Sequence, residues 1–217
     1  MPHHHPSQEM LLSYAAGTMS EPLSLLVATH LALCPDCRRE VAAYEALGGE
    51  EIEQQPLETV GSDSLAQVLD RLDVPTAASF EVALPETGQV DIRVPRPLRD
   101  YLGGPLEQLD WRHRGGVSEA SLLADRKDLR TRLMRIKPKT AIPEHTHHGP
   151  EYTLVLTGGF SDGVGHYTRG DVAFADPSVQ HKPVADPGED CICLAVTEGN
   201  LRFTGPIARL LSPLLQR

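Results

Sequence analysis

The spacing of hydrophobic residues changes partway along this 217-residue chain. Near residue 70, apolar side chains recur three and four positions apart, as Leu65, Val68, Leu69 and Leu72 do, which is the period of an amphipathic helix. Farther along, the period shortens to two in short runs such as "RTRLMRI" and "CICLAVT", divided by Gly, Pro and Asp. The chain is therefore predicted to be an α+β multidomain protein, with a small all-α domain followed by an antiparallel β-sandwich or barrel.

The predicted domain boundaries follow this change. Residues 1–75 form the helical domain, residues 76–97 are a linker rich in Pro, Ala, Thr and Glu, and residues 98–217 form the β domain. The tail "GPIARLLSPLLQR" is expected to add a last short helix. Each domain is long enough to bury a core of its own.

Local signals divide the helical domain into segments. Gly17 is expected to end a first helix, Ser20 to cap a second, and Pro35 to begin a third that stops at the pair Gly48 and Gly49. The stripe from Leu65 to Leu72 marks a fourth helix. That stripe is expected either to pack on its own domain or to contact a partner protein.

The negative charge is concentrated near the N-terminus. Residues 1–90 hold 14 Asp and Glu against 3 Arg and no Lys, a net charge of −11, whereas the remainder holds 16 acids and 17 bases. Such a surface repels nucleic acid and attracts basic protein surfaces. Nucleic acid is therefore not an expected partner. The alternative explanation is an acidic domain whose charge serves solubility alone.

The chain shows no signal for membrane insertion or export. It has no run of eighteen apolar residues, and its start, "MPHHHPSQEM", lacks the features of a secretory signal. Two of its four cysteines have C-x-x-C spacing, which suits a reducing compartment better than a disulfide framework does. We expect a cytoplasmic protein without a membrane partner.

The stretch "THLALCPDCRRE" contains three potential metal ligands. His30 and Cys34 are four residues apart and share a helix face, and Cys37 follows one turn into the next helix. Cysteine sulfur and histidine nitrogen are the ligands of tetrahedral zinc. The fourth ligand has to come from elsewhere in the helical domain, where "HHH" at residues 3–5 offers the candidates. The alternative is a reduced cysteine pair beside a surface histidine.

A second group of ligands lies in the β domain, in "EHTHHGPEYTLVLTG". His145 and His147 point to one face of a strand, Glu151 returns on the next strand, and His181 follows in a later turn. His148 is turned to the opposite face and is not expected to take part. Three imidazoles and one carboxylate suit Zn²⁺, Fe²⁺, Mn²⁺ or Ni²⁺, and the sequence does not select among them.

These motifs resemble those of a known family. His145, His147, Glu151 and Gly158, followed by Gly170-Asp171 and His181, match the two cupin motifs, and residues 11–49 resemble a zinc-binding anti-sigma domain. Together they resemble the ChrR family of cytoplasmic anti-sigma factors over nearly the whole chain. The resemblance implies a β domain of the cupin type, and it points to His5 as the fourth zinc ligand, with His4 as the neighbouring alternative.

The resemblance also implies a function. Family members sequester an extracytoplasmic-function sigma factor, block its binding to core RNA polymerase and release it under singlet oxygen or related oxidative stress. The implied cofactors are zinc in the helical domain and zinc or another divalent transition metal in the cupin. The paired thiols Cys191 and Cys193 match a family pair, and they serve either in redox sensing or in packing.

Two other functional classes are compatible with these motifs. Cupins with three His and one Glu include dioxygenases and isomerases, so a metal-dependent enzyme with a structural zinc domain is the main alternative. A scaffold that only stores zinc is the weaker one. The fused zinc-binding helices favour a regulator without catalytic residues.

Overall fold

The computed structural model describes residues 1–72, 91–123, 129–199 and 201–203. The chain divides into two compact units: residues 1–46 together with 91–217, and residues 47–90. The first unit therefore combines most of the predicted helical domain with the β domain. The tail for which a last helix was predicted lies outside the described residues.

Three helices open the chain, and their ends follow the expected capping signals. Ser7 caps α1 (Gln8–Ala15) by accepting a hydrogen bond from the Met10 amide, and Gly17 follows with φ of +66°. Ser20 is the N-cap of α2 (Glu21–Leu33). Cys34 ends α2, and α3 (Pro35–Glu53) begins at the next residue, as the proline predicts.

The predicted stop of the third helix at Gly48 and Gly49 is wrong. Helix α3 continues through both glycines to Glu53. A glycine inside a helix costs only about 1 kcal/mol relative to alanine. The good helix formers on both sides, "EAL" and "EEIE", offset that cost.

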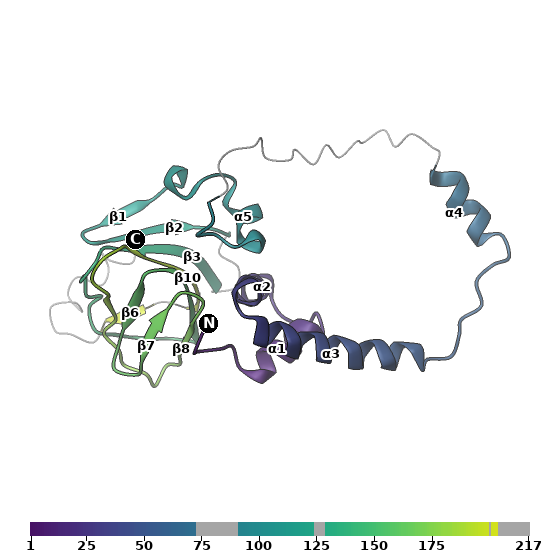
Figure 1. The fold of residues 1–217 in the computed structure, drawn as a ribbon, viewed down its shortest axis with the longest axis horizontal. Coiled ribbons are helices and arrows are strands. Elements are labelled where there is room, and N and C mark those ends of the chain that lie inside the picture. Colours follow the sequence, from purple (N-terminus) through teal and green to yellow (C-terminus); the bar gives the residue numbers. More distant parts are fainter. Residues whose placement is uncertain (73–90, 124–128, 200, 204–217) are drawn as a thin grey trace. The chain divides into compact units, whose positions relative to one another are not determined.

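The β domain is a barrel dominated by one six-stranded antiparallel sheet (Figure 1). Four of its strands contain the runs expected from the period of two. In spatial order the sheet contains β1 (Arg112–Arg114), β2 (Val117–Ser121), β3 (Leu129–Ile136), β10 (Cys191–Glu198), β5 (Glu151–Thr157) and β8 (Val172–Ala175).

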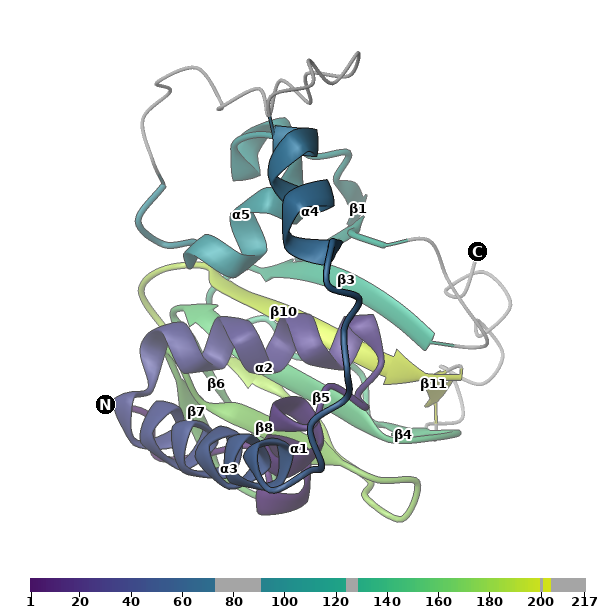
Figure 2. The ribbon, with the colours of Figure 1, turned by 90° about the vertical axis from the view of Figure 1, so that its right-hand side faces the viewer.

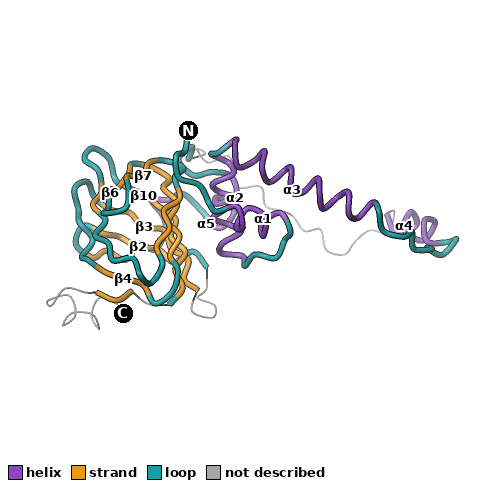
Figure 3. Tube along the Cα trace, turned by 90° about the horizontal axis from the view of Figure 1, so that it is seen from below, coloured by secondary structure: helices purple, strands orange, loops and turns teal. Residues whose placement is uncertain are grey.

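Two smaller antiparallel sheets complete the barrel. They pair β11 (Leu201–Phe203) with β4 (His145–His147), and β6 (Gly159–Ser161) with both β7 (His166–Thr168) and β9 (Val184–Ala185). Figure 3 shows the strands curling around one interior while α1 and α2 stay outside it. This all-β unit beside helices has the predicted α+β class.

The segment before the barrel is more ordered than a linker where the structure describes it. Helix α5 (Arg96–Leu102) crosses the predicted boundary at residue 98 and is followed by the 3₁₀ turn η1 (Leu106–Gln108). Val94 is 1% exposed and belongs to the core. Two of the prolines that suggested a linker, Pro95 and Pro97, lie at the start of α5, where proline fits a helix.

Helix α2 packs on the outer face of the large sheet, across β3 and β10 (Figure 2). Its Leu25 and Leu26 join one core cluster with Leu154 of β5 and Leu194 of β10, and α5 contributes Leu98. Strand β10 is consequently buried on both faces, one covered by helices and the other turned to the barrel interior. The helical region and the cupin thus share one core.

In the second unit, α4 (Ser64–Leu72) forms as predicted and shows no buried residue. The described helices include none that is both long and apolar enough to cross a membrane.

The shared core predicts a stability effect. Leu26→Ala should lower the free energy of unfolding of the first unit by about 2–5 kcal/mol, because the fully buried Leu26 fills space between α2 and the sheet. Denaturant unfolding measures it, with Leu12→Ala on α1 as the control, because that side chain is 53% exposed. An unchanged unfolding midpoint for Leu26→Ala would contradict the packing of α2 on the cupin.

Candidate metal centres

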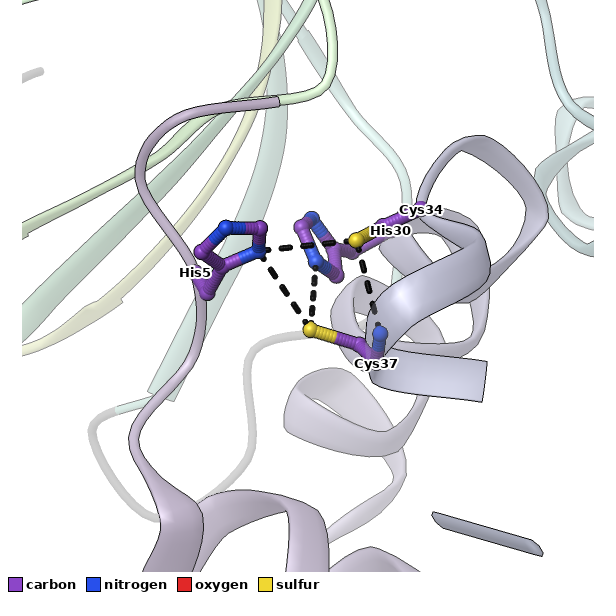
Figure 4. Close-up of side chains that lie close together, drawn as sticks. All are labelled: His5, His30, Cys34 and Cys37. Atoms are coloured by element: carbon purple, nitrogen blue, oxygen red, sulfur yellow. Dashed lines mark hydrogen bonds between the residues drawn. The ribbon is translucent and has the colours of Figure 1, made fainter. Parts of the chain in front are cut away.

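The four predicted ligands of the helical region lie together. One ligand atom from each of His5, His30, Cys34 and Cys37 lies within 4.8 Å of every other (Figure 4). His30 comes from the last turn of α2, Cys34 from its C-cap and Cys37 from the first turn of α3. His5 reaches them from the extended segment before α1. The turn between two helices therefore meets the start of the chain.

His5, rather than His4, faces the sulfur atoms. His5 Nδ1 lies 3.5 Å from Cys34 Sγ and 3.4 Å from Cys37 Sγ. The His4 ring instead packs on Tyr167 of the cupin, with ring centroids 4.6 Å apart. The geometry thus favours the histidine to which the family resemblance points.

The separations fit one tetrahedral ion. Zinc bonds of about 2.3 Å to sulfur and about 2.05 Å to nitrogen place neighbouring S and N ligands about 3.6 Å apart. The three sulfur–nitrogen distances here are 3.3, 3.4 and 3.5 Å. Burial raises the pKa of the Cys37 thiol to about 12, and the Cys34 thiol adds to this. A metal that binds here would displace the thiol proton.

A backbone carbonyl of the cupin orients His30. The Nδ1–H group of His30 donates to the Gly170 carbonyl oxygen at 2.8 Å, which leaves Nε2 turned toward Cys37 Sγ at 3.3 Å. Burial lowers the pKa of His30 to about 4, so the ring is neutral at pH 7, as a metal ligand must be. Such a hydrogen bond fixes the tautomer of a ligating histidine.

The next residue, Asp171, holds the segment that carries His5. Its buried carboxylate accepts hydrogen bonds from the backbone amides of His3 (2.5 Å) and His4 (2.9 Å). Burial alone would raise the pKa of Asp171, but amide donors including those of His4, Thr168 and His3 lower it. The Val172 amide in turn donates to the His4 carbonyl at 3.0 Å.

The Gly170 position tolerates no larger residue. Its φ of +92° is in the region that favours glycine, and an added Cβ would lie 2.7 Å from Pro2 Cγ. The turn from Gly170 to Val172, between β7 and β8, therefore contacts both the His5 segment and His30. We call it the clamp turn.

The four predicted ligands of the cupin also converge. His145, His147, Glu151 and His181 each offer an atom within 4.8 Å of the others. The first two come from β4 and Glu151 from the start of β5, and His181 is joined to His145 by two backbone hydrogen bonds. His148, the adjacent histidine, is exposed and lies outside the group, as the pleat predicts.

Three imidazole nitrogens point at one another in this group. His181 Nε2 lies 3.0 Å from His147 Nε2 and 3.1 Å from His145 Nε2. The Nδ1 atoms of His145 and His181 are paired with the Pro143 carbonyl and the Asp162 carboxylate, at 2.9 and 3.0 Å. These bonds place the Nδ1 protons outward and the Nε2 lone pairs inward.

Inward-facing nitrogen lone pairs repel one another unless a cation lies between them. Burial lowers the pKa of His145 to about 4 and that of His147 to about 3, so neither ring protonates at pH 7 to relieve their repulsion. With metal–nitrogen bonds of about 2.1 Å, the observed separations place the ligands about a right angle apart. The donor set therefore fits one divalent transition metal ion.

The two remaining cysteines lie next to this second site. Cys191 and Cys193 are free and buried, on neighbouring stretches of β10 separated by a register shift. Cys193 lines the barrel cavity that His145 and Glu151 also line, whereas Cys191 packs with Phe160 and other apolar residues. The neighbouring Cys191 thiol and burial raise the pKa of Cys193, so it stays a thiol at pH 7.

The sequence predicted seven of the eight ligand candidates and the family resemblance pointed to His5, but neither indicated the residues that support them. Asp162 has no pattern that links it to His181, nineteen residues away. Gly170 and Asp171 were noted as part of a cupin motif, but nothing in the sequence ties them to residues 3–5 or 30. Those contacts exist only once the helices have packed on the barrel.

Metal analysis of the purified chain tests both sites. We expect about two metal ions per chain, about one after Cys34→Ser together with Cys37→Ser, and about one after His145→Ala together with His147→Ala, because each pair removes half of a ligand set. The exposed His148→Ala is the matched control. Two ions retained in either double variant would show that the corresponding group is not a metal site.

Comparison with known proteins agrees with this geometry. Residues 104–201 match the family model of the ChrR cupin-like domain. The chain is 40% identical over 214 residues, 98% of each chain, to the anti-sigma-E factor ChrR of Cereibacter sphaeroides. It also resembles the crystal structure of Rhodobacter sphaeroides SigE in complex with the anti-sigma ChrR, with a TM-score of 0.78, 41% identity, and coverage of 91% of this chain and 100% of that one. The chain belongs to the ChrR family of anti-sigma factors.

Proposed function

We propose that this protein sequesters an extracytoplasmic-function sigma factor, blocks its binding to core RNA polymerase, and releases it in response to singlet oxygen or related oxidative stress sensed through the cupin. The relative solved in complex with SigE supports the choice of partner. The observation that carries the release mechanism is the clamp turn, through which the cupin contacts His30 and the backbone of the segment that carries His5.

Zinc at the N-terminal site would hold the helical region in its binding form. His5, His30, Cys34 and Cys37 are its proposed ligands. Helix α1 has only eight residues and is marginal by itself. A structural zinc ion contributes its binding free energy to folding. The ion would thereby fix the angle between α2 and α3.

The second unit supplies a surface for the sigma factor. Residues 47–90 carry nine Asp and Glu and one Arg, a net charge of −8. On α4, Leu65 and Leu72 are 70% and 73% exposed, and Val68 and Leu69 are about half exposed. An exposed apolar stripe in an acidic unit is complementary to a groove that is apolar at its centre and basic at its rim. We assign that groove to the sigma factor.

The cupin metal set and the N-terminal site are connected by strand β5. Glu151 begins this strand, and four residues later Val155 exchanges backbone hydrogen bonds with the clamp turn: its amide donates to Asp171 and its carbonyl accepts from Gly170. A change at the cupin set that displaces β5 would therefore strain the contacts to His30 and the His5 segment. Weakened support of these ligands would loosen the helices and release the sigma factor.

Cys191 and Cys193 are candidates for part of the sensing step. Cys193 pairs in register with Val155, the residue that contacts the clamp turn. Oxidation of this buried thiol would add polar volume on the cavity face of β10, beside Val155 of β5. The same placement also suits a packing role.

Binding to the sigma factor tests the sequestration. Leu69→Asp should weaken the complex at least tenfold, because it places a charge in the centre of the α4 stripe. Gln67→Asp, the same charge change on the same helix, should have a small effect. The readouts are co-purification with the sigma factor and inhibition of sigma-dependent transcription. Equal affinity of both variants would remove α4 from the interface.

Release tests the sensing role. His147→Ala, Glu151→Gln and the double change Cys191→Ser with Cys193→Ser should each leave inhibition intact but slow release under singlet oxygen or organic peroxide. Loss of inhibition in the absence of either oxidant would instead indicate that the cupin is structural for the helical region. Unchanged release in the double cysteine variant would leave these thiols as packing residues.

The clamp turn has its own test. Asp171→Asn should speed the loss of zinc from the N-terminal site to a chelator severalfold, because an amide is a weaker acceptor for the His3 and His4 N–H groups than a carboxylate is. Asp176→Asn is the control, since that carboxylate accepts hydrogen bonds from Ser178 within its own turn. Equal zinc loss in both variants would contradict a supporting role for Asp171.

A further inference from the structure

The interior of the cupin barrel contains a cavity of about 320 Å³. This volume lies within the range of small-molecule sites. One side of the cavity carries three members of the metal set: His145, Glu151 and His181. The role proposed for the cupin uses the metal set and the cysteines but leaves the rest of this cavity without a function.

The other side of the cavity is lined by four arginines, Arg112 and Arg114 of β1 and Arg130 and Arg132 of β3. All but Arg112 are partly buried. Arg114, Arg130 and Arg132 already have interactions within the chain. A guanidinium has five N–H donors, so an arginine held by one partner still has donors for a ligand.

The described lining is cationic on this side. Its carboxylates are Glu119, Glu151 and Asp162. Glu151 belongs to the metal set and Asp162 is bonded to His181, so only Glu119, paired in register with Arg112, lies among the arginines. Four guanidinium groups provide more N–H donors than Glu119 and one partner for each arginine can take up, which suits an anionic ligand.

Strand register fixes the span between the two sides. Thr197 of β10 lies between Arg130 on β3 and Glu151 on β5, and Ala195 lies between Arg132 and Thr153. Two strand spacings separate the backbones of the outer residues by about 10 Å. The small side chains of Thr197 and Ala195 leave space between the two sides. The arginine side chains are long, so the gap between their guanidinium groups and the metal set is shorter than the backbone separation and suits a short ligand.

The cavity also has apolar walls. Ile142 and Pro183 lie next to the metal set in sequence, and Met134 lies beside Cys193 in register. An inorganic anion would leave these walls in contact with water. An organic anion would cover them and place its charged group on the arginines.

We propose that the barrel cavity binds a small organic carboxylate, with its acid group on Arg130 and Arg132 and its apolar body between Met134 and the metal set. Binding there would place the ligand against β5 and β10, the strands that pair at Val155 and Cys193. This inference deepens the proposed sensing role. Its test measures binding alone, so its failure would leave the anti-sigma function untouched.

Calorimetry of the full-length, metal-loaded protein with hexanoate tests the proposal. We expect hexanoate to bind at least tenfold more tightly than 1-hexanol, which has the same chain length without the charge, and more tightly than inorganic phosphate. Arg132→Gln should weaken hexanoate binding at least tenfold, with Arg132→Lys less affected. Arg96→Gln, an exposed arginine at the start of α5, is the control.

A second variant separates loss of binding from loss of folding. Ala195→Leu keeps every charge but fills the space between Arg132 and Thr153, and it should also abolish hexanoate binding. Thermal unfolding checks that each variant folds. The proposal is overturned if hexanoate does not bind, if hexanol or phosphate binds equally well, or if binding depends on the metal but not on Arg132.

Discussion

The hydrogen bond from His30 to the Gly170 carbonyl joins the N-terminal ligand group to the cupin barrel. It orients a buried imidazole so that Nε2 faces the cysteine sulfurs, and it makes a cupin backbone atom part of the helical region's metal site. Asp171 extends the connection by holding the amides of His3 and His4. The N-terminal site is therefore assembled by two parts of the chain that are about 140 residues apart.

This joint construction suggests why a regulator would fuse a cupin to helices that carry a group of potential metal ligands. Leu25 and Leu26 of α2 are buried in the same core as the sheet, so a rearrangement of either part is felt by the other. Close-packed interiors respond to small displacements by switching arrangement rather than by yielding gradually. A modest shift of β5 would thus suffice to change how firmly the N-terminal ligands are held, without any contact between the signal and the sigma factor.

The sequence predicted the parts of this structure that depend on local spacing. His145 and His147 share a strand face because side chains alternate, and His30 and Cys34 share a helix face because the period is near four. His5 needed the family resemblance, because no local rule ties it to residue 34. The third helix continues through Gly48 and Gly49 because the helix formers on both sides offset the cost of the two glycines. Helix α5 was not predicted because prolines at a helix start also suit a linker. The roles of Gly170, Asp171 and the four arginines of the barrel cavity depend on tertiary packing and strand register, which local patterns do not specify.

Amide hydrogen exchange at Val172 tests whether the proposed N-terminal metal site and the clamp turn stabilise each other. The Val172 amide donates to the His4 carbonyl, so its protection reports on the clamp. Coupling between two sites is reciprocal. Removing the N-terminal metal by Cys34→Ser with Cys37→Ser should therefore speed exchange at Val172, while strand amides within β10 keep their protection. Unchanged protection of Val172 in the metal-free variant would contradict the coupling.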